Sequence, residues 1–151
     1  MVFLDTNLLV YMVAETSPFH DAARTLYQQV ITGRLEACIS PQVLCEFLAA
    51  CTNEKRIHPV LGIEHAVRES LVFWQAQSLQ KIFPHTTTME RALALIRRYH
   101  VSRQQVFDAF LAATMLDNGI KTIYTLNTKD FLVFHELQAI HPFERHTAKT
   151  S

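Results

Sequence analysis

The 151-residue chain is 49% hydrophobic and 19% charged, so it can bury one core and is too polar for a membrane protein. No apolar run approaches the roughly 20 residues of a membrane-spanning helix, and the N-terminus lacks a signal-peptide pattern, so we expect a soluble cytoplasmic protein. Three cysteines without a CxxC pair suggest neither a disulfide framework nor a thiolate zinc site. The net charge of zero removes the simplest argument for nucleic-acid binding, a basic surface overall, but it leaves local basic patches open.

Short apolar runs alternate with longer helical patterns. In chain order, we predict strand 2–5 ("VFLD"), helix 17–33, strand 36–40 ("EACIS"), helix 40–53, helix 63–80, edge strand 81–85 ("KIFPH"), helix 87–100, helix 102–119, strand 121–126 ("KTIYTL"), a loop or short turn 127–131 and a last strand 137–143. Ser17 and Ser40 each precede a proline at the first helical position, and Ser102 caps a third helix. Gly33 and Gly119 end two helices.

This order of elements predicts an α/β fold. Strands that alternate with helices imply right-handed crossovers and a parallel sheet covered on both faces. We therefore expect a doubly wound sandwich with a central, mainly parallel sheet of four to five strands. The sequence contains no linker, repeat or low-complexity segment, so we predict one domain over residues 1–143, followed by a short polar tail at 144–151.

Two acidic residues follow predicted strands. In doubly wound sheets, ligands bind beyond the carboxyl ends of the strands, where the strand order reverses. Asp5 ends the first strand, and Asn127 through Asp130 follow strand 121–126, so the two acids reach one crevice if these strands are neighbours. Each residue also has an ordinary structural interpretation: Asp5 can cap the helical run that follows it, and Asp130 can be a simple loop acid.

Two further acids, Glu46 and Asp108, lie inside helices that are apolar on most sides. An ionised carboxylate that is half buried costs several kcal/mol unless it is paired or bound to a metal. The positions one helical turn away from each acid hold Gln or Ala, so no basic partner lies on the same helix. The partner must come from elsewhere, and a salt bridge across helices is the structural alternative.

Together, the four acids provide the hard oxygen ligands that Mg²⁺ or Mn²⁺ prefers. One or two such ions are consistent with this set, and two ions about 4 Å apart can bind a scissile phosphate, activate a water and stabilise the leaving oxygen. The eight histidines are scattered without a closely spaced pair or an HExxH motif, which argues against zinc.

Four motifs occur in a fixed order: "FLDTN", "SPQVLCEF", "FDAFLAATMLDNG" and "IYTLNTKDF". In this order and spacing they resemble PIN-domain nucleases, and particularly the VapC-type toxins of type II toxin–antitoxin pairs. The resemblance spans roughly residues 1–143. It implies a PIN-like fold and a Mg²⁺- or Mn²⁺-dependent endoribonuclease that hydrolyses RNA phosphodiester bonds and acts as a toxin.

The resemblance also implies roles for individual residues. It places metal-binding, catalytic carboxylates at Asp5, Glu46, Asp108 and Asp130, with Thr6, Asn7 and Asn127 in supporting positions that orient ligands or water. Either Asp130 or Asn127 supplies the fourth group. The implied partners are RNA, a cognate antitoxin and a second copy of the chain in a homodimer.

RNA binding also needs positive charge near the acids. Arg103 precedes the helix of Asp108 and is the predicted RNA contact, with a solvated helix face as the ordinary alternative. Lys55 and Arg56 form a second basic candidate. Two other functions stay open: a catalytically inactive PIN-like binding or assembly module, and a PIN-type nuclease that acts on another nucleic acid.

Overall fold

The computed structural model describes residues 1–144, so residues 145–151 of the predicted polar tail lie outside the described residues. Within residues 1–144, five strands form one sheet in the order β3-β2-β1-β4-β5, and every neighbouring pair is parallel. The strands are β1 (Val2–Leu4), β2 (Ala37–Ile39), β3 (Leu79–Lys81), β4 (Thr122–Tyr124) and β5 (Gln138–Ile140). The predicted doubly wound, parallel α/β fold is confirmed.

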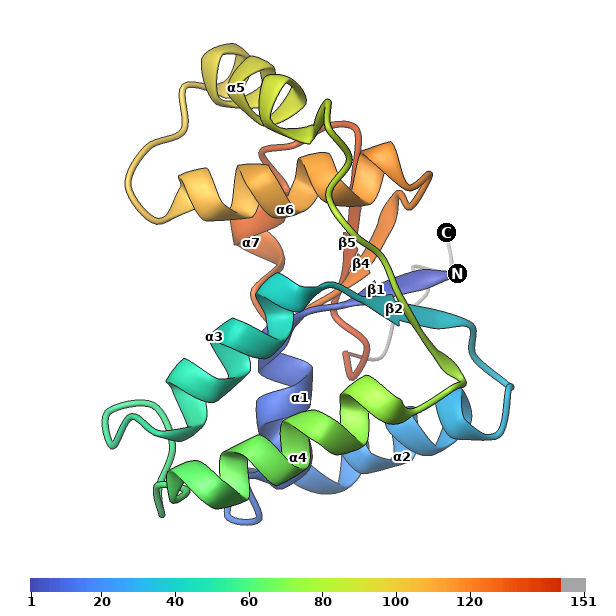
Figure 1. The fold of residues 1–151 in the computed structure, drawn as a ribbon, viewed down its shortest axis with the longest axis vertical. Helices are drawn as coiled ribbons and strands as arrows, with labels where there is room; N and C mark the ends of the chain where they lie inside the picture. Colours follow the sequence, from blue (N-terminus) through green and yellow to red (C-terminus); the bar gives the residue numbers. More distant parts are fainter. Residues whose placement is uncertain (145–151) are drawn as a thin grey trace, which may run out of the picture.

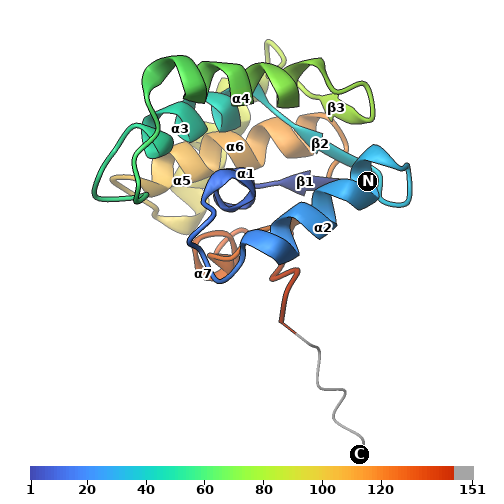
Figure 2. The ribbon, with the colours of Figure 1, turned by 90° about the horizontal axis from the view of Figure 1, so that it is seen from below.

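Seven helices within the described residues cover the sheet. They are α1 (Thr6–Val13), α2 (His20–Ile31), α3 (Pro41–Cys51), α4 (Ile63–Gln75), α5 (Thr88–Tyr99), α6 (Gln105–Asp117) and α7 (Thr128–Phe131). Figure 1 shows α1 to α4 on one side of the sheet and α5 to α7 on the other, and Figure 2 shows α1 and α2 in front of α5 and α6. This sandwich arrangement is the one that right-handed crossovers in both directions from β1 produce.

The core fills both interfaces between the sheet and the helices. Its largest fully buried side chains include Phe3, Phe47 and Phe134. Of the three free cysteines, Cys38 and Cys51 are buried and Cys45 is exposed. No helix among the described residues combines the length and apolarity needed to cross a membrane.

Several predicted helix boundaries are wrong. Helix α2 begins at His20, because Ser17 and the following proline form a turn in which the Ser17 hydroxyl accepts a hydrogen bond from Phe19 N–H at 3.2 Å. Helix α6 begins at Gln105 because Arg103 has a left-handed backbone (φ +55°), so Ser102 cannot serve as its cap.

Other boundaries shift for reasons of strand pairing. Helix α4 ends at Gln75, five residues before the predicted end, because residues 79–81 pair with β2 as the edge strand β3. That edge strand was predicted at 81–85. The segment predicted as a loop or short turn contains a single helical turn, α7.

The strand order places β1 between β2 and β4. Strands β2 and β3 lie on one side of β1, and β4 and β5 lie on the other, so the strand order reverses at β1. The backbone N–H of Asp5 donates to Tyr124 C=O at 3.0 Å, so the end of β1 is fixed to the end of β4. The condition for bringing the first and last acids together is therefore met, because the two strands are direct neighbours.

Candidate active site at the carboxyl edge of the sheet

A pocket of about 680 Å³ opens beyond the carboxyl ends of β1 and β4, between α3 and the first turn of α6. Its size falls within the roughly 300–1,000 Å³ of typical ligand pockets. The seven residues with predicted metal-binding or supporting roles all line it: Asp5, Thr6, Asn7, Glu46, Asp108, Asn127 and Asp130. The predicted RNA contact Arg103 does not line it; of the described residues, Arg56 is the only Lys or Arg that does.

Asp5 is the most buried of the four predicted acids, with only 8% of its surface exposed. Its Oδ1 accepts the backbone N–H of Thr6 at 2.7 Å, and its Oδ2 accepts the Thr125 hydroxyl at 2.6 Å and the Asn7 amide at 2.9 Å. Asp5 is therefore the N-cap of α1 while its carboxylate lines the pocket. The capping interpretation and a functional role are compatible.

Burial raises the pKa of Asp5 from 3.8 to about 6, and the charges of Glu46 and Asp130 act in the same direction. The hydrogen bonds from Thr125 and Thr6 lower the pKa, but by less than burial raises it. Burial and like-charged neighbours both disfavour the ionised form of a carboxyl group, and its pKa rises as a result. The site thus favours a proton, or another positive charge, on Asp5.

Glu46 is held from two helices. Its Oε2 accepts the Thr6 hydroxyl at 2.9 Å, and its Oε1 accepts the Gln42 amide at 2.8 Å. Gln42 lies one turn before Glu46 on α3 and also donates to Phe107 C=O at 3.2 Å, which ties α3 to α6 across the pocket. Glu46 thus has a neutral hydrogen-bonding partner on its own helix, although it has no basic one there.

Asp108 and Asp130 are held less tightly than the other two acids. Asp108, in the first turn of α6, is half buried, and within residues 1–144 no hydrogen bond to its side chain is found. Burial raises the pKa of Asp108 from 3.8 to about 7, and the nearby carboxylates add to the shift. Asp130, in α7, is exposed.

The donor set fits a hard divalent cation in chemical terms. All four acids carry carboxylate oxygens, the donor type that such an ion prefers. None of the ion pairs within residues 1–144 involves any of them, so the predicted alternative of a salt bridge across helices is not found there. In the described part of the chain, however, no three His, Cys, Asp or Glu side chains converge closely enough to hold a metal ion. Holding a shared ion therefore requires side-chain rotation, for which the less constrained Asp108 and Asp130 are best suited.

The model of the PIN domain family matches residues 2–137. The chain belongs to the PIN domain family. Ribonuclease VapC24 of Mycobacterium tuberculosis is 27% identical to it over 135 residues, which cover 89% of this chain and 91% of that protein. The resemblance to PIN-domain nucleases and to VapC proteins is therefore confirmed as a distant homology.

Solved structures share the fold. The Mycobacterium tuberculosis toxin VapC20, described as cleaving the sarcin-ricin loop, superposes with a TM-score of 0.68 at 16% identity, covering 89% of this chain and 95% of that one. VapBC2 from Rickettsia felis, bound to a DNA fragment from its promoter, gives 0.65 at 17% identity, covering 93% and 98%. A toxin–antitoxin complex from Klebsiella pneumoniae gives 0.61 at 19% identity, covering 95% and 99%.

Thr125 is the residue of this PIN domain that sequence reasoning missed. Its fully buried hydroxyl donates to Asp5 and accepts hydrogen bonds from the Asn7 amide at 3.1 Å and from the backbone N–H of Asn127 at 3.0 Å. One hydroxyl thus connects three of the predicted site residues. The signal was present in the motif "TLNTKDF", whose first residue is Thr125.

We expect Thr125→Val to raise the pKa of Asp5 above its present value of about 6, because the substitution removes the hydrogen bond that favours the ionised carboxylate. The free energy of unfolding should fall by about 1–3 kcal/mol, since buried donors lose their acceptor. Carboxyl titration by NMR and urea unfolding measure the two effects. Thr125→Ser keeps the hydroxyl and should restore both; an unchanged titration in the Val variant would show that the hydroxyl does not stabilise the charge.

We expect Asp108→Asn to stabilise the metal-free protein. Because the folded-state pKa of about 7 exceeds the ordinary value of 3.8, the folded protein holds this proton more tightly than the unfolded chain, and stability is lost as pH rises through this window. After allowance for solvent screening at a half-buried site, the variant should gain about 1–2 kcal/mol above pH 7.

The gain from Asp108→Asn should shrink as the pH falls toward 4, where the wild-type carboxyl is itself protonated when folded. Thermal unfolding in a chelating buffer at several pH values measures this dependence. A gain that does not vary with pH would contradict the electrostatic origin of the effect.

Proposed function

We propose that this PIN-domain protein is a Mg²⁺- or Mn²⁺-dependent endoribonuclease that hydrolyses RNA phosphodiester bonds and is the toxin of a toxin–antitoxin pair. The observation that carries the proposal is the gathering of four carboxylates, Asp5, Glu46, Asp108 and Asp130, around one pocket at the reversal point of the sheet. The distant homology to ribonuclease VapC24 supports the same reaction.

One or two divalent ions would be held by Asp5, Glu46 and Asp108, with Asp130 or Asn127 as the fourth group. When bound, such ions polarise the phosphate and lower the pKa of an attacking water. Hydrogen bonds to both Asp5 oxygens fix that carboxylate's orientation, and Thr6 and Gln42 do the same for Glu46. The protein thus prepares two rigid ligands before substrate arrives, which reduces the reorganisation that catalysis requires.

Further lines of the proposal concern organisation and partners. A single domain over residues 1–143 agrees with the family match and with β5 ending at Ile140. A cognate antitoxin is supported by the solved relatives, two of which are described as a toxin–antitoxin complex and as VapBC2. A homodimer and a cytoplasmic location complete the proposal. The homodimer is tested by light scattering, which should give about twice the mass of the monomer.

The decisive experiment incubates the purified protein with total cellular RNA and with single-stranded DNA, in Mg²⁺ and separately in Mn²⁺, and separates the products on denaturing gels. We expect discrete RNA fragments and uncut DNA. Cleavage of DNA alone would identify a nuclease for another nucleic acid. The absence of any cleavage, together with calorimetry that detects no divalent-ion binding at millimolar concentration, would instead indicate an inactive binding or assembly module.

A further inference from the structure

One wall of the pocket carries an exposed aromatic ring. Gln104, Phe107 and Asp108 are spaced so that they share one face at the start of α6, and all three line the pocket. The Phe107 side chain is 57% exposed, although it directly precedes a half-buried acid. A phenylalanine left this open to water gives up most of the free energy that its burial would provide, so the ring is available to a ligand.

The backbone that carries this ring is anchored from the opposite helix. Gln42 Nε2 donates to the backbone C=O of Phe107 at 3.2 Å and to Glu46 Oε1 at 2.8 Å. The same amide therefore holds a site carboxylate and the backbone that presents the ring. A platform anchored in this way binds a flat ligand at a lower entropic cost than a ring on a loose loop.

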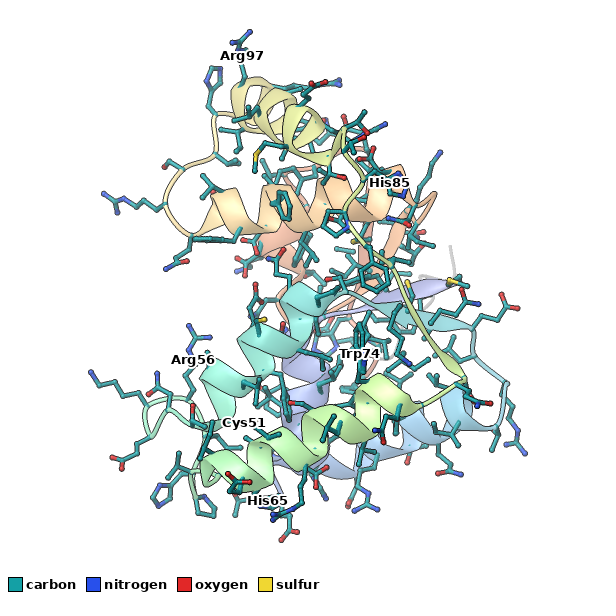
Figure 3. The ribbon with its side chains drawn as sticks, viewed as in Figure 1. Cys51, Arg56, His65, Trp74, His85 and Arg97 are labelled. Atoms are coloured by element: carbon teal, nitrogen blue, oxygen red, sulfur yellow. The ribbon has the colours of Figure 1, made fainter. Side chains whose placement is uncertain are left out.

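The other wall carries one positive charge. Arg56 comes from the turn after α3, where its backbone N–H donates to Asn53 C=O at 2.9 Å, and both residues line the pocket. Figure 3 shows Arg56 beside the C-terminal end of α3, on the side that faces α6. Within residues 1–144 the Arg56 guanidinium forms no ion pair, even with the pocket's own carboxylates.

The charges of the pocket determine which wall suits the phosphate of a nucleotide and which suits its base. Four carboxylates repel a phosphate unless a cation lies among them, so a second phosphate of the strand is best placed at Arg56. The uncharged base meets no such repulsion at Phe107. The neutral side chains of Gln104 and Asn53 add hydrogen-bonding groups to the same walls.

We propose that Phe107 and Arg56 form a nucleotide subsite, in which Phe107 stacks an unpaired base next to the scissile bond and Arg56 contacts a neighbouring phosphate. This inference rests on the proposed function and assigns to these two residues the parts of a single-stranded RNA that they would contact. A base in a duplex is covered on both faces by its neighbours, whereas a base in a loop or bulge can turn out onto an aromatic ring.

The test uses a short fluorescein-labelled single-stranded RNA and the full-length protein carrying Asp5→Asn, with Mg²⁺ present, so that binding is measured without cutting. Phe107→Leu, which keeps an apolar side chain but loses the aromatic face, should weaken binding about tenfold. Phe107→Trp should restore it. Phe83→Ala, at an exposed phenylalanine outside the pocket, is the matched control and should change nothing.

Two readouts separate stacking from a general structural effect. In RNA with 2-aminopurine substituted at successive positions, one position should lose fluorescence on binding, and Phe107→Leu should abolish that quenching. For the phosphate contact, Arg56→Ala should reduce the slope of log affinity against log salt by about 0.7, as expected for one contact to a single strand. Arg56→Lys should keep the slope, and so should Arg97→Ala, which removes an exposed charge on α5 (Figure 3).

Unchanged RNA affinity and unchanged quenching in Phe107→Leu would overturn the subsite, even if the wild-type protein cuts RNA. A variant that loses affinity only for a protein partner would overturn it as well. Conversely, Phe107-dependent quenching in a protein whose wild-type form cuts no RNA would uphold the subsite and refute the nuclease. DNA of the same sequence that binds equally well would uphold stacking and show that the 2′-hydroxyl is not recognised.

Discussion

Asp5→Asn and Asp108→Asn are each expected to reduce RNA cleavage by about a thousandfold or more while the protein stays folded. An amide keeps the volume of the carboxyl group but removes the negative charge and one of the two side-chain oxygens. Because Asp5 is buried and its oxygens are oriented by three hydrogen bonds, no nearby carboxylate can take over its position. Initial cleavage rates and circular dichroism of each variant measure activity and folding separately.

Asp117→Asn is the matched control, because it makes the same change at the other end of α6. There the carboxylate accepts the Thr88 hydroxyl and pairs with Arg91, and these contacts hold the pKa of Asp117 below its usual value. The control should therefore lose stability and keep its cleavage rate, whereas Asp108→Asn should gain stability and lose its rate. Wild-type rates in Asp5→Asn would remove this residue from the reaction.

Chelation of divalent ions should abolish cleavage completely, and Mg²⁺ or Mn²⁺ added in excess of the chelator should restore it. If Asp5 and Asp108 hold the ions as proposed, they must first lose protons that they hold with pKa values of about 6 and about 7. Ion affinity should accordingly rise with pH through this range and level off above it. Titration calorimetry at about pH 5.5 and about pH 8 should differ by at least about tenfold in affinity.

Robust cleavage in excess EDTA would contradict this prediction, as would equal ion affinities at the two pH values. Asp108→Asn provides an internal check that does not depend on activity. The added ions should raise the melting temperature of the wild-type protein more than that of the variant, because the variant has one ligand charge fewer.

The sequence predicted those parts of the site that depend on local patterns. Asp5 follows a short apolar strand, and the alternation of strands with helices implies that parallel strands end at one edge. These two facts are enough to bring Asp5 and the segment around Asp130 together once β1 and β4 are neighbours. Periodicity also located Glu46 and Asp108 on helices with apolar surroundings.

The sequence could not predict features that arise from contacts between distant segments. Arg103 was chosen because it lies close to Asp108 along the chain, but its left-handed backbone turns the chain before α6 and it does not line the pocket. Arg56, which with Lys55 was the second basic candidate, does line the pocket, from a turn about 50 residues away from Asp108 in sequence. The sequence could not rank it above Arg103, because only the packing of α3 near α6 brings it there. The role of Gln42 also depends on packing, because its amide contacts Glu46 and the Phe107 backbone at the same time only when α3 and α6 meet.

The capping role of Asp5 bears on how such a protein loses its activity. Asn is as good a helix N-cap as Asp, so Asn at position 5 can start α1 without the negative charge that the proposed metal site needs. The genetic code connects Asp and Asn by a single-base change. In cells under selection against a harmful nuclease, we therefore expect escape alleles at this position to encode abundant, full-length protein. A mutational scan should find that Asn at position 5 leaves the abundance of the protein unchanged but removes its toxicity.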